Sequence, residues 1–238
     1  MAGAAHYVAL GDSISVDDYS GGPGRGGASL LFANRDDDFP DWRGRDLLAV
    51  EPGTRFSLLA TDGATTRTLL ARQLPRLRAL ELHPSVVTLT IGGNDLLGSY
   101  GDSGAARAVI CRVADAVAQA LRVVADHLAP SGRVVVGTVY DPSDGTGDAA
   151  RLGLPPWADA VRRIAELNES LRSVARAHGA AVADIHGEFL GHGLHAGDPG
   201  RREPRPAARD LWFCNVIEPN AWGADGVRRA FWAALHDA

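Results

Sequence analysis

The stretch that decides the fold is YVALGDS, residues 7–13, in which a short apolar run leads directly into Gly-Asp-Ser. An apolar run of this length, ended by glycine, is typical of a buried strand in a parallel sheet. Ligands of such sheets bind beyond the carboxyl ends of the strands. Ser13 follows the predicted strand at that edge, so we expect a functional role for it. Its hydroxyl makes it a candidate nucleophile.

Four further apolar runs resemble the first, and they occupy residues 56–60, 86–91, 134–139 and 181–185. Apolar residues recur with helical spacing in residues 66–82, 106–128, 157–174 and 227–234. Pro75 is expected to kink or split the first of these helices. Strands that alternate with helices predict right-handed crossovers and a doubly wound α/β fold. The remaining polar stretches are predicted loops over the carboxyl edge, at residues 17–27, 141–153 and 187–209.

Length and composition indicate a single domain over residues 1–238. With 45% hydrophobic residues, the chain can bury a full core without disulfides or metals. The net charge of -5 and the lack of a basic block argue against a nucleic-acid partner. No apolar run is long enough to span a membrane and the first residues lack the features of a secretory signal, so we expect a cytoplasmic protein. Cys111 and Cys214 predict free thiols, and we expect neither a metal nor a cofactor.

Residues that suit nucleophilic catalysis follow the first strands. Gly63 comes after the second predicted strand and Asn94 after the third, so both should meet Ser13 at one edge of the sheet. A serine hydroxyl attacks a carbonyl when a base takes its proton and nearby donors stabilise the oxyanion. Glycine lets a backbone N–H approach a substrate oxygen closely, and the asparagine amide donates without carrying charge. Taken singly, each motif is also compatible with a turn or a helix cap.

These motifs resemble those of the SGNH or GDSL hydrolases, a family with a Gly-Asp-Ser block, a lone glycine, a Gly-x-Asn-Asp block and a C-terminal Asp-x-x-His block. The first three occur here in order, at residues 11–13, Gly63 and residues 92–95. The resemblance spans the chain and implies a three-layer α/β/α, flavodoxin-like fold with a five-stranded parallel sheet. It also implies hydrolysis of a small-molecule acyl ester through an acyl-serine intermediate. Ser13 would be the nucleophile, and its own N–H, Gly63 and Asn94 the oxyanion hole.

The fourth block departs from the family pattern. The segment that aligns with it by its Pro-Asn-x-x-Gly tail is NVIEPNAWG, residues 215–223, in which Asn215 stands for the aspartate and Glu218 for the histidine. Those two positions normally supply the base and the residue that orients it. Glu218 is a candidate replacement base, and burial would have to raise its pKa from the ordinary value of about 4.3. Asn215 would then orient the carboxylate by donating a hydrogen bond.

Other assignments of the base and of the function stay open. The base is alternatively one of His186, His192 and His195, which cluster at and after the fifth predicted strand without a firm zinc-ligand spacing. The chain is alternatively a silent ligand-binding protein that has kept its pocket and lost its reaction. A third hypothesis is a hydrolase that uses its carboxylates in a different chemistry.

Several polar and aromatic residues also have a structural explanation. Asp12 and Asp95 are expected to hold loops through backbone hydrogen bonds, and Asp17 and Asp18 to be solvated, although together with Glu218 they would make an acidic mouth. The stretch 140–142, Tyr-Asp-Pro, is expected to be a turn. Tryptophans near element ends usually complete the core but can line a pocket, and these are Trp42, Trp157, Trp212 and Trp222.

Overall fold

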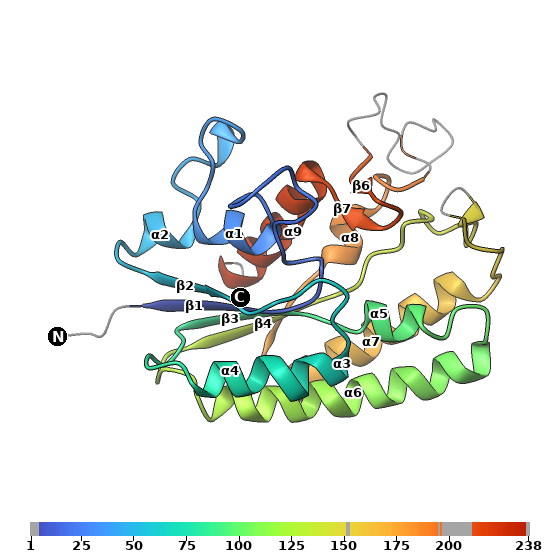
Figure 1. The fold of residues 1–238 in the computed structure, drawn as a ribbon, viewed down its shortest axis with the longest axis horizontal. Helices are drawn as coiled ribbons and strands as arrows, with labels where there is room; N and C mark the ends of the chain where they lie inside the picture. The colour runs from blue at the N-terminus through green and yellow to red at the C-terminus, as the bar shows by residue number, and fades with distance from the viewer. Residues whose placement is uncertain (1–4, 151–152, 195, 197–210, 237–238) are drawn as a thin grey trace.

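A five-stranded parallel sheet forms the centre of the protein (Figure 1). The computed structural model describes residues 5–150, 153–194, 196 and 211–236. The strands lie in the order β2-β1-β3-β4-β5, and all neighbouring pairs are parallel. Their bounds are β1 (His6–Gly11), β2 (Arg55–Leu58), β3 (Val86–Thr90), β4 (Arg133–Gly137) and β5 (Ala181–Ala183). Each strand overlaps the apolar run that predicted it, so the α/β fold is confirmed.

Helices cover both faces of the sheet and complete three layers. In Figure 1, α1 and α9 lie on one side of the strands, and α4, α6 and α7 on the other. The helix bounds are α1 (Gly27–Phe32), α2 (Leu47–Val50), α3 (Thr66–Thr68), α4 (Leu74–Arg78), α5 (Gly93–Leu97), α6 (Ser103–Ala125), α7 (Ala160–Ala177), α8 (Ile185–Phe189) and α9 (Ala221–His236). No helix in these described ranges is long and apolar enough to cross a membrane.

The core is divided between the two faces by the alternation of side chains along the strands. On β1, Val8 and Leu10 belong to the cluster under α4, α6 and α7, whereas Tyr7 and Ala9 belong to the cluster under α1, α8 and α9. All residues of β1 are buried because helices cover both of its faces. This strand is therefore a rigid support for the residues that follow it.

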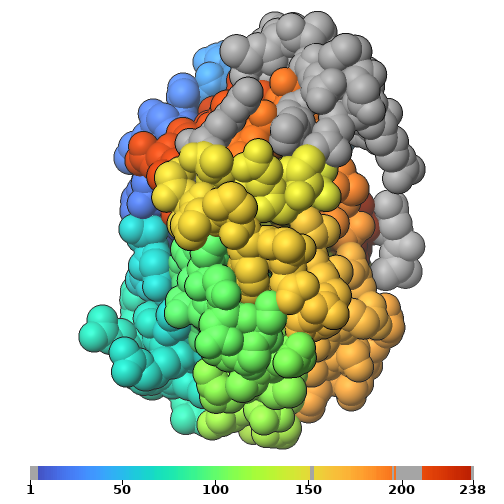
Figure 2. All heavy atoms as spheres, turned by 90° about the vertical axis from the view of Figure 1, so that its right-hand side faces the viewer, coloured from blue at the N-terminus to red at the C-terminus, as the bar shows by residue number. Residues whose placement is uncertain are grey.

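The order of the strands places a crevice directly after β1. The chain leaves β1 for β2 on one side and returns to β3 on the other, so the connections at the carboxyl ends of β1 and β3 diverge. Doubly wound sheets bind their ligands at this switch point. Figure 2 faces the same edge, where the yellow segment that follows β4 lies next to the green segment of α5.

The structure corrects the expected elements in three places. The segment 66–82 is divided into α3, a π-helical turn (Leu69–Gln73) and α4, with Pro75 in the first turn of α4, where its missing N–H costs no helical bond. Asp17 is not simply solvated, because its carboxylate accepts hydrogen bonds from the N–H groups of Gly24 and Gly26. The predicted loop 187–209 begins inside α8, and most of its second half lies outside the described residues.

An antiparallel hairpin that the sequence pattern did not predict precedes α9. It consists of β6 (Phe213–Cys214) and β7 (Glu218–Pro219), with Cys214 paired opposite Glu218. Strands of this length show no periodicity, so the hairpin carries no signal in the sequence. Asn220 ends it and caps α9, since its side-chain oxygen accepts hydrogen bonds from the N–H groups of Trp222 and Gly223.

Candidate active site

Ser13 lies one turn beyond β1, in the crevice at the switch point. Gly11 ends the strand with φ +127°, and a Cβ atom on it would lie 2.0 Å from the backbone oxygen of Thr90. Only glycine therefore lets β1 end this close to β3. The N–H of Asp12 then donates to the same Thr90 oxygen at 3.0 Å. Ser13 itself is 8% exposed and lines a cavity, so a ligand there would meet its hydroxyl.

Asp12 is buried directly beside Ser13. Its carboxyl oxygen Oδ1 accepts a hydrogen bond from the N–H of Ile14 at 3.2 Å, as expected for a residue that holds a loop. Burial raises the pKa of Asp12 to about 7, and the charge of Glu218 adds to the increase, whereas hydrogen bonds from Thr90 and Ile14 oppose it. Asp12 therefore holds the loop and also titrates near neutral pH, inside the site.

The loop that carries Gly63 is hydrogen-bonded to Asn94 on α5. Asn94 lines the same cavity as Ser13, and its amide nitrogen Nδ2 donates to the backbone oxygen of Ala64 at 3.0 Å. Since an amide nitrogen carries two hydrogens, a second donor is left for a ligand. Gly63 adopts φ +64° and has open space where a Cβ would stand. The structure thus brings the Gly63 loop to Asn94.

Asp95, next to Asn94 on α5, has the structural role that the sequence favoured. Its carboxylate accepts hydrogen bonds from the N–H of Thr66 at 2.9 Å and from the Thr66 hydroxyl at 2.7 Å. The carboxylate thereby fixes the start of α3, the helix that follows the Gly63 loop. Its oxygens are used by the protein and do not face the cavity as free acceptors.

The β6–β7 hairpin brings Glu218 to Ser13. Burial raises the pKa of the Glu218 carboxyl, the nearby charge of Asp62 raises it further, and hydrogen bonding by the Ser13 hydroxyl lowers it. The carboxyl oxygen Oε2 is buried and has no hydrogen-bond partner among the described residues. Glu218 is therefore a carboxylate beside Ser13 that no cation of the described chain neutralises.

Asn215 does not orient Glu218. It is exposed in the turn of the hairpin, where Asn215 and Val216 adopt φ +40° and +74°. The register places Cys214 rather than Asn215 opposite Glu218, and within the described chain the Asn215 side chain makes no hydrogen bond. The predicted hydrogen bond from Asn215 to the carboxylate is therefore wrong. Asparagine instead suits this position because it tolerates a left-handed backbone better than most residues.

The histidines considered as alternative bases lie away from the cavity where they are described. The N–H of His186 donates to the Thr138 hydroxyl at 2.9 Å, and burial lowers the pKa of its ring. The ring of His192 is buried and stacks on Trp212 with the ring centroids 3.6 Å apart. His195 lies outside the described residues. In the part of the chain that the structure describes, no histidine lines the cavity that holds Ser13.

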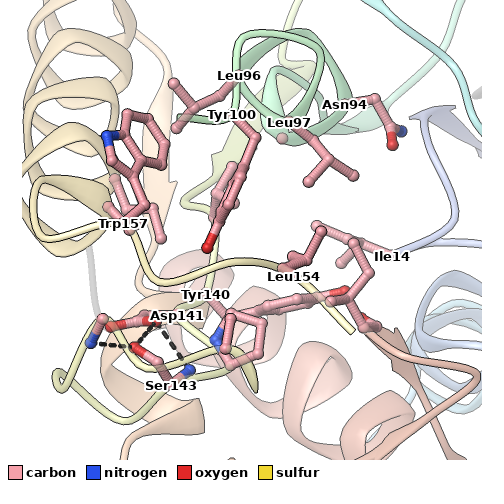
Figure 3. Close-up of a pocket in the computed structure, with 18 of the residues that line it drawn as sticks. Ile14, Asn94, Leu96, Leu97, Tyr100, Tyr140, Asp141, Ser143, Leu154 and Trp157 are labelled. Carbon is pink, nitrogen blue, oxygen red and sulfur yellow. Dashed lines mark hydrogen bonds between the residues drawn. The ribbon is translucent and has the colours of Figure 1, made fainter. Parts of the chain in front are cut away.

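The cavity beside Ser13 is apolar and has a volume of about 110 Å³. In Figure 3, Asn94 and Ile14 lie on one side of the view and Trp157 on the other. The rings of Tyr100 and Trp157 meet edge to face, with their centroids 5.0 Å apart. Hydrogen bonds from Tyr100 Oη to Pro155 and from Trp157 Nε1 to Ser103 occupy their polar atoms. The large side chains of the lining are Leu96, Leu97, Tyr100, Tyr140, Leu154 and Trp157.

Sequence reasoning favoured a turn for Tyr140 over a place in the site, and it missed Ile217. Tyr140 was expected in a turn, but its buried ring lines the cavity and its hydroxyl donates to the backbone oxygen of Ile217 at 2.6 Å. This bond ties the hairpin that carries Glu218 to the segment after β4. A signal existed in the position of Tyr140, since residues that follow a parallel strand lie at the binding edge. Four tryptophans were considered from the sequence as pocket residues. Trp157 lines the cavity, and Trp42, Trp212 and Trp222 do not.

Acidic residues near the site are engaged with the protein. The carboxylate of Asp141 accepts from the N–H groups of Ser143 and Gly145, and that of Asp144 from those of Gly191 and Gly193. Dashed lines in Figure 3 mark the bonds between Asp141 and Ser143. Within the described ranges, no group of three or more His, Cys, Asp and Glu side chains is placed to hold a metal ion.

Comparisons with known proteins agree with the motifs. The sequence profile of the GDSL-like lipase/acylhydrolase family matches residues 9–224. A lipase from Streptomyces rimosus is 31% identical over 216 residues, which are 82% of this chain and 75% of that protein. Among solved structures, a member of the lipolytic protein G-D-S-L family from Veillonella parvula has a TM-score of 0.62 at 18% identity and covers 98% of each chain.

Two further solved structures show the same fold. An acetylxylan esterase from Geobacillus stearothermophilus has a TM-score of 0.64 at 16% identity, over 98% of this chain and 94% of that chain. An extracellular lipase from Streptomyces rimosus has a TM-score of 0.55 at 23% identity, over 97% of this chain and all (100%) of that chain. At these identities the structural likenesses show the shared architecture.

Proposed function

Since the chain belongs to the GDSL-like lipase/acylhydrolase family, whose reaction class is acyl ester hydrolysis, we propose that it hydrolyses a small or medium acyl ester through an acyl-Ser13 intermediate. The observation that carries this proposal is the position of Ser13: its side chain lines an apolar cavity and has the Glu218 carboxyl beside it. A nucleophile needs both a substrate pocket and a proton acceptor, and both adjoin Ser13.

In the proposed mechanism, Glu218 takes the proton of the Ser13 hydroxyl as the oxygen Oγ attacks the ester carbonyl. The carbonyl oxygen becomes an oxyanion, which accepts hydrogen bonds from the N–H groups of Ser13 and Gly63 and from Nδ2 of Asn94. Collapse of the tetrahedral intermediate releases the alcohol, which receives the proton from Glu218. Glu218 then takes a proton from a water molecule, whose oxygen attacks the acyl-enzyme carbonyl. The bond to Ser13 Oγ breaks, Glu218 returns the proton to Oγ, and the carboxylic acid leaves.

The raised pKa of Glu218 supports its role as the base. A general base works best when its pKa lies near the working pH, and burial together with the charge of Asp62 moves Glu218 in that direction. The buried Oε2 atom lacks a partner in the described chain, and a buried oxygen without a hydrogen bond disfavours the charged carboxylate, in agreement with the raised pKa. Asn215 has no part in this mechanism because it does not reach the carboxylate.

The cavity supports a limit on the acyl group. Its volume of about 110 Å³ and its apolar lining suit a short hydrocarbon chain, which would end against Tyr100 and Trp157. A substrate with a long acyl chain would need these aromatic side chains to move.

The cytoplasmic location expected from the sequence stays a prediction, and the lipase from Streptomyces rimosus that shares the fold is extracellular.

Covalent labelling by a fluorophosphonate tests the proposal. We expect the protein to be labelled on Ser13, as located by mass spectrometry of its peptides, and to hydrolyse p-nitrophenyl acetate. Ser13→Ala should abolish both activities while the protein stays folded. Absence of labelling and hydrolysis in the wild-type protein across the neutral pH range would instead support a silent ligand-binding protein. Hydrolysis that survives Ser13→Ala would support a different carboxylate chemistry.

A further inference from the structure

Gln73 completes the hydrogen bonding of β1 where that strand ends. The regular register between β1 and β2 stops at Ala9 and Leu58, and beyond it the N–H groups of both Leu59 and Ala60 donate to the backbone oxygen of Ala9. The N–H of Gly11 donates to Oε1 of Gln73 at 2.8 Å, and Nε2 of Gln73 donates to the backbone oxygen of Gly11 at 2.7 Å. The side-chain amide thus bonds both the backbone N–H and the backbone oxygen of Gly11. Gly11 is two residues before Ser13.

The same amide also reaches the loop of Gly63. Nε2 of Gln73 lies 3.3 Å from the hydroxyl oxygen of Thr61, and the N–H of Thr61 donates to the backbone oxygen of Gly11 at 3.1 Å. Thr61 is two residues before Gly63. One buried side chain, 1% exposed, therefore contacts the backbone of Gly11 and the hydroxyl of Thr61, each two residues before a proposed oxyanion donor.

The helical segment that carries Gln73 is held at its other end by the residue next to Asn94, the third proposed donor. Thr66, at the start of this segment, is held by both oxygens of Asp95, the residue after Asn94. Between Thr66 and Gln73 the chain forms a π-helical turn, a rare widening that is frequent at functional sites. The segment from Thr66 to Gln73 therefore spans the loops of all three proposed donors.

We propose that Gln73 is a positioning residue for the oxyanion hole, which sets the distance between the N–H groups of Ser13 and Gly63. The inference rests on the proposed function, since it assigns a role in forming that site. Donors stabilise an oxyanion only when they are placed within a fraction of an ångström of the required geometry. Gly11 has no side chain with which to fix its own position, so the contact from Gln73 supplies that constraint.

Replacement of Gln73 by methionine tests the inference, because methionine has a similar length and neither donates nor accepts as an amide does. We expect kcat for p-nitrophenyl acetate to fall by about 10- to 100-fold with little change in KM, since oxyanion contacts strengthen in the transition state. The affinity for an alkyl boronic acid, which forms a tetrahedral adduct on serine, should fall in parallel. Inhibition by the product acetate should be unchanged.

Leu77→Met is the matched control, because Leu77 is equally buried on α4 and its apolar side chain makes no hydrogen bond to these loops. It should retain the wild-type kcat. If Gln73→Met does not fold, Gln73→Glu and Thr61→Val provide the comparison. Gln73→Glu removes the Nε2 donor that bonds both Gly11 and Thr61, and Thr61→Val removes the second of these contacts alone. Unchanged kcat and boronic acid affinity in folded Gln73 variants would overturn the inference while Ser13 labelling still stands. Failure of wild-type labelling would overturn the proposed function instead.

Discussion

Replacing Asp12 by asparagine should remove a stability loss that the wild-type protein suffers as the pH rises. Burial raises the pKa of Asp12 from 3.8 to about 7 in the folded protein. In the unfolded chain the carboxyl ionises near its ordinary pKa. Asparagine keeps the side-chain oxygen that accepts from the N–H of Ile14 but cannot ionise. The comparison therefore isolates the charge.

The magnitude follows from the difference between the two pKa values. Below about pH 4, Asp12 is protonated in both states and contributes no pH dependence. Between the unfolded and the folded pKa, only the folded state holds the proton, so the free energy of unfolding falls by about 1.4 kcal/mol per pH unit. Above about pH 7 the loss is complete. Over this window of about three units, the wild-type protein loses about 4 kcal/mol that the variant retains.

Urea unfolding at a series of pH values measures this effect. The difference in unfolding free energy between Asp12→Asn and the wild type should grow in favour of the variant from about pH 4 to about pH 7 and then level off. The same pair compared in a Glu218→Gln background should show a smaller difference, because the charge of Glu218 contributes to the raised pKa of Asp12. A difference that does not vary with pH would refute the reasoning.

Two further predictions concern activity. Asp62→Asn should move the acid limb of the pH–rate profile to lower pH, because removal of a negative charge lowers the pKa of Glu218. Asp115→Asn on the distant α6 is the control and should leave the limb where it is. An unmoved limb in Asp62→Asn would contradict this electrostatic coupling. Trp157→Ala should shift the preference among p-nitrophenyl esters toward longer acyl chains, by about 3- to 4-fold in kcat/KM for each added methylene that the cavity buries. Trp222 is exposed, so Trp222→Ala should keep the wild-type order of preference. An unchanged preference in Trp157→Ala would mean that the acyl chain lies elsewhere.

The fold was predictable because its signals are local and strong. Each sheet strand contains a short apolar run, and the long covering helices show an apolar stripe. The strands therefore followed from the apolar runs and the helices from their periodicity. The residues at the strand ends, Ser13 and Asn94, followed from the rule that parallel strands present their carboxyl ends to the ligand. The structure places both on one cavity.

The sequence pointed to Glu218, the carboxylate that lies beside Ser13, but not to its surroundings. Alignment of the fourth block pointed to Glu218, but the hairpin that carries it has strands too short for a periodic signal. Its register puts Cys214 opposite Glu218, which is why the expected contact with Asn215 fails. Gln73 was also missed. Its hydrogen bonds to Gly11 form where the regular pairing of β1 with β2 ends, and no local sequence pattern indicates that position.

The pH dependence of Ser13 labelling tests the central claim most directly. The second-order rate of fluorophosphonate labelling should rise in the wild-type protein as Glu218 ionises, at a pH above the ordinary glutamate value, and Asn215→Ala should leave this profile unchanged. Glu218→Gln should label far more slowly and lose that ionisation, because no carboxylate remains to take the proton. Labelling of folded Glu218→Gln at the wild-type rate and with the wild-type pH profile would contradict the account.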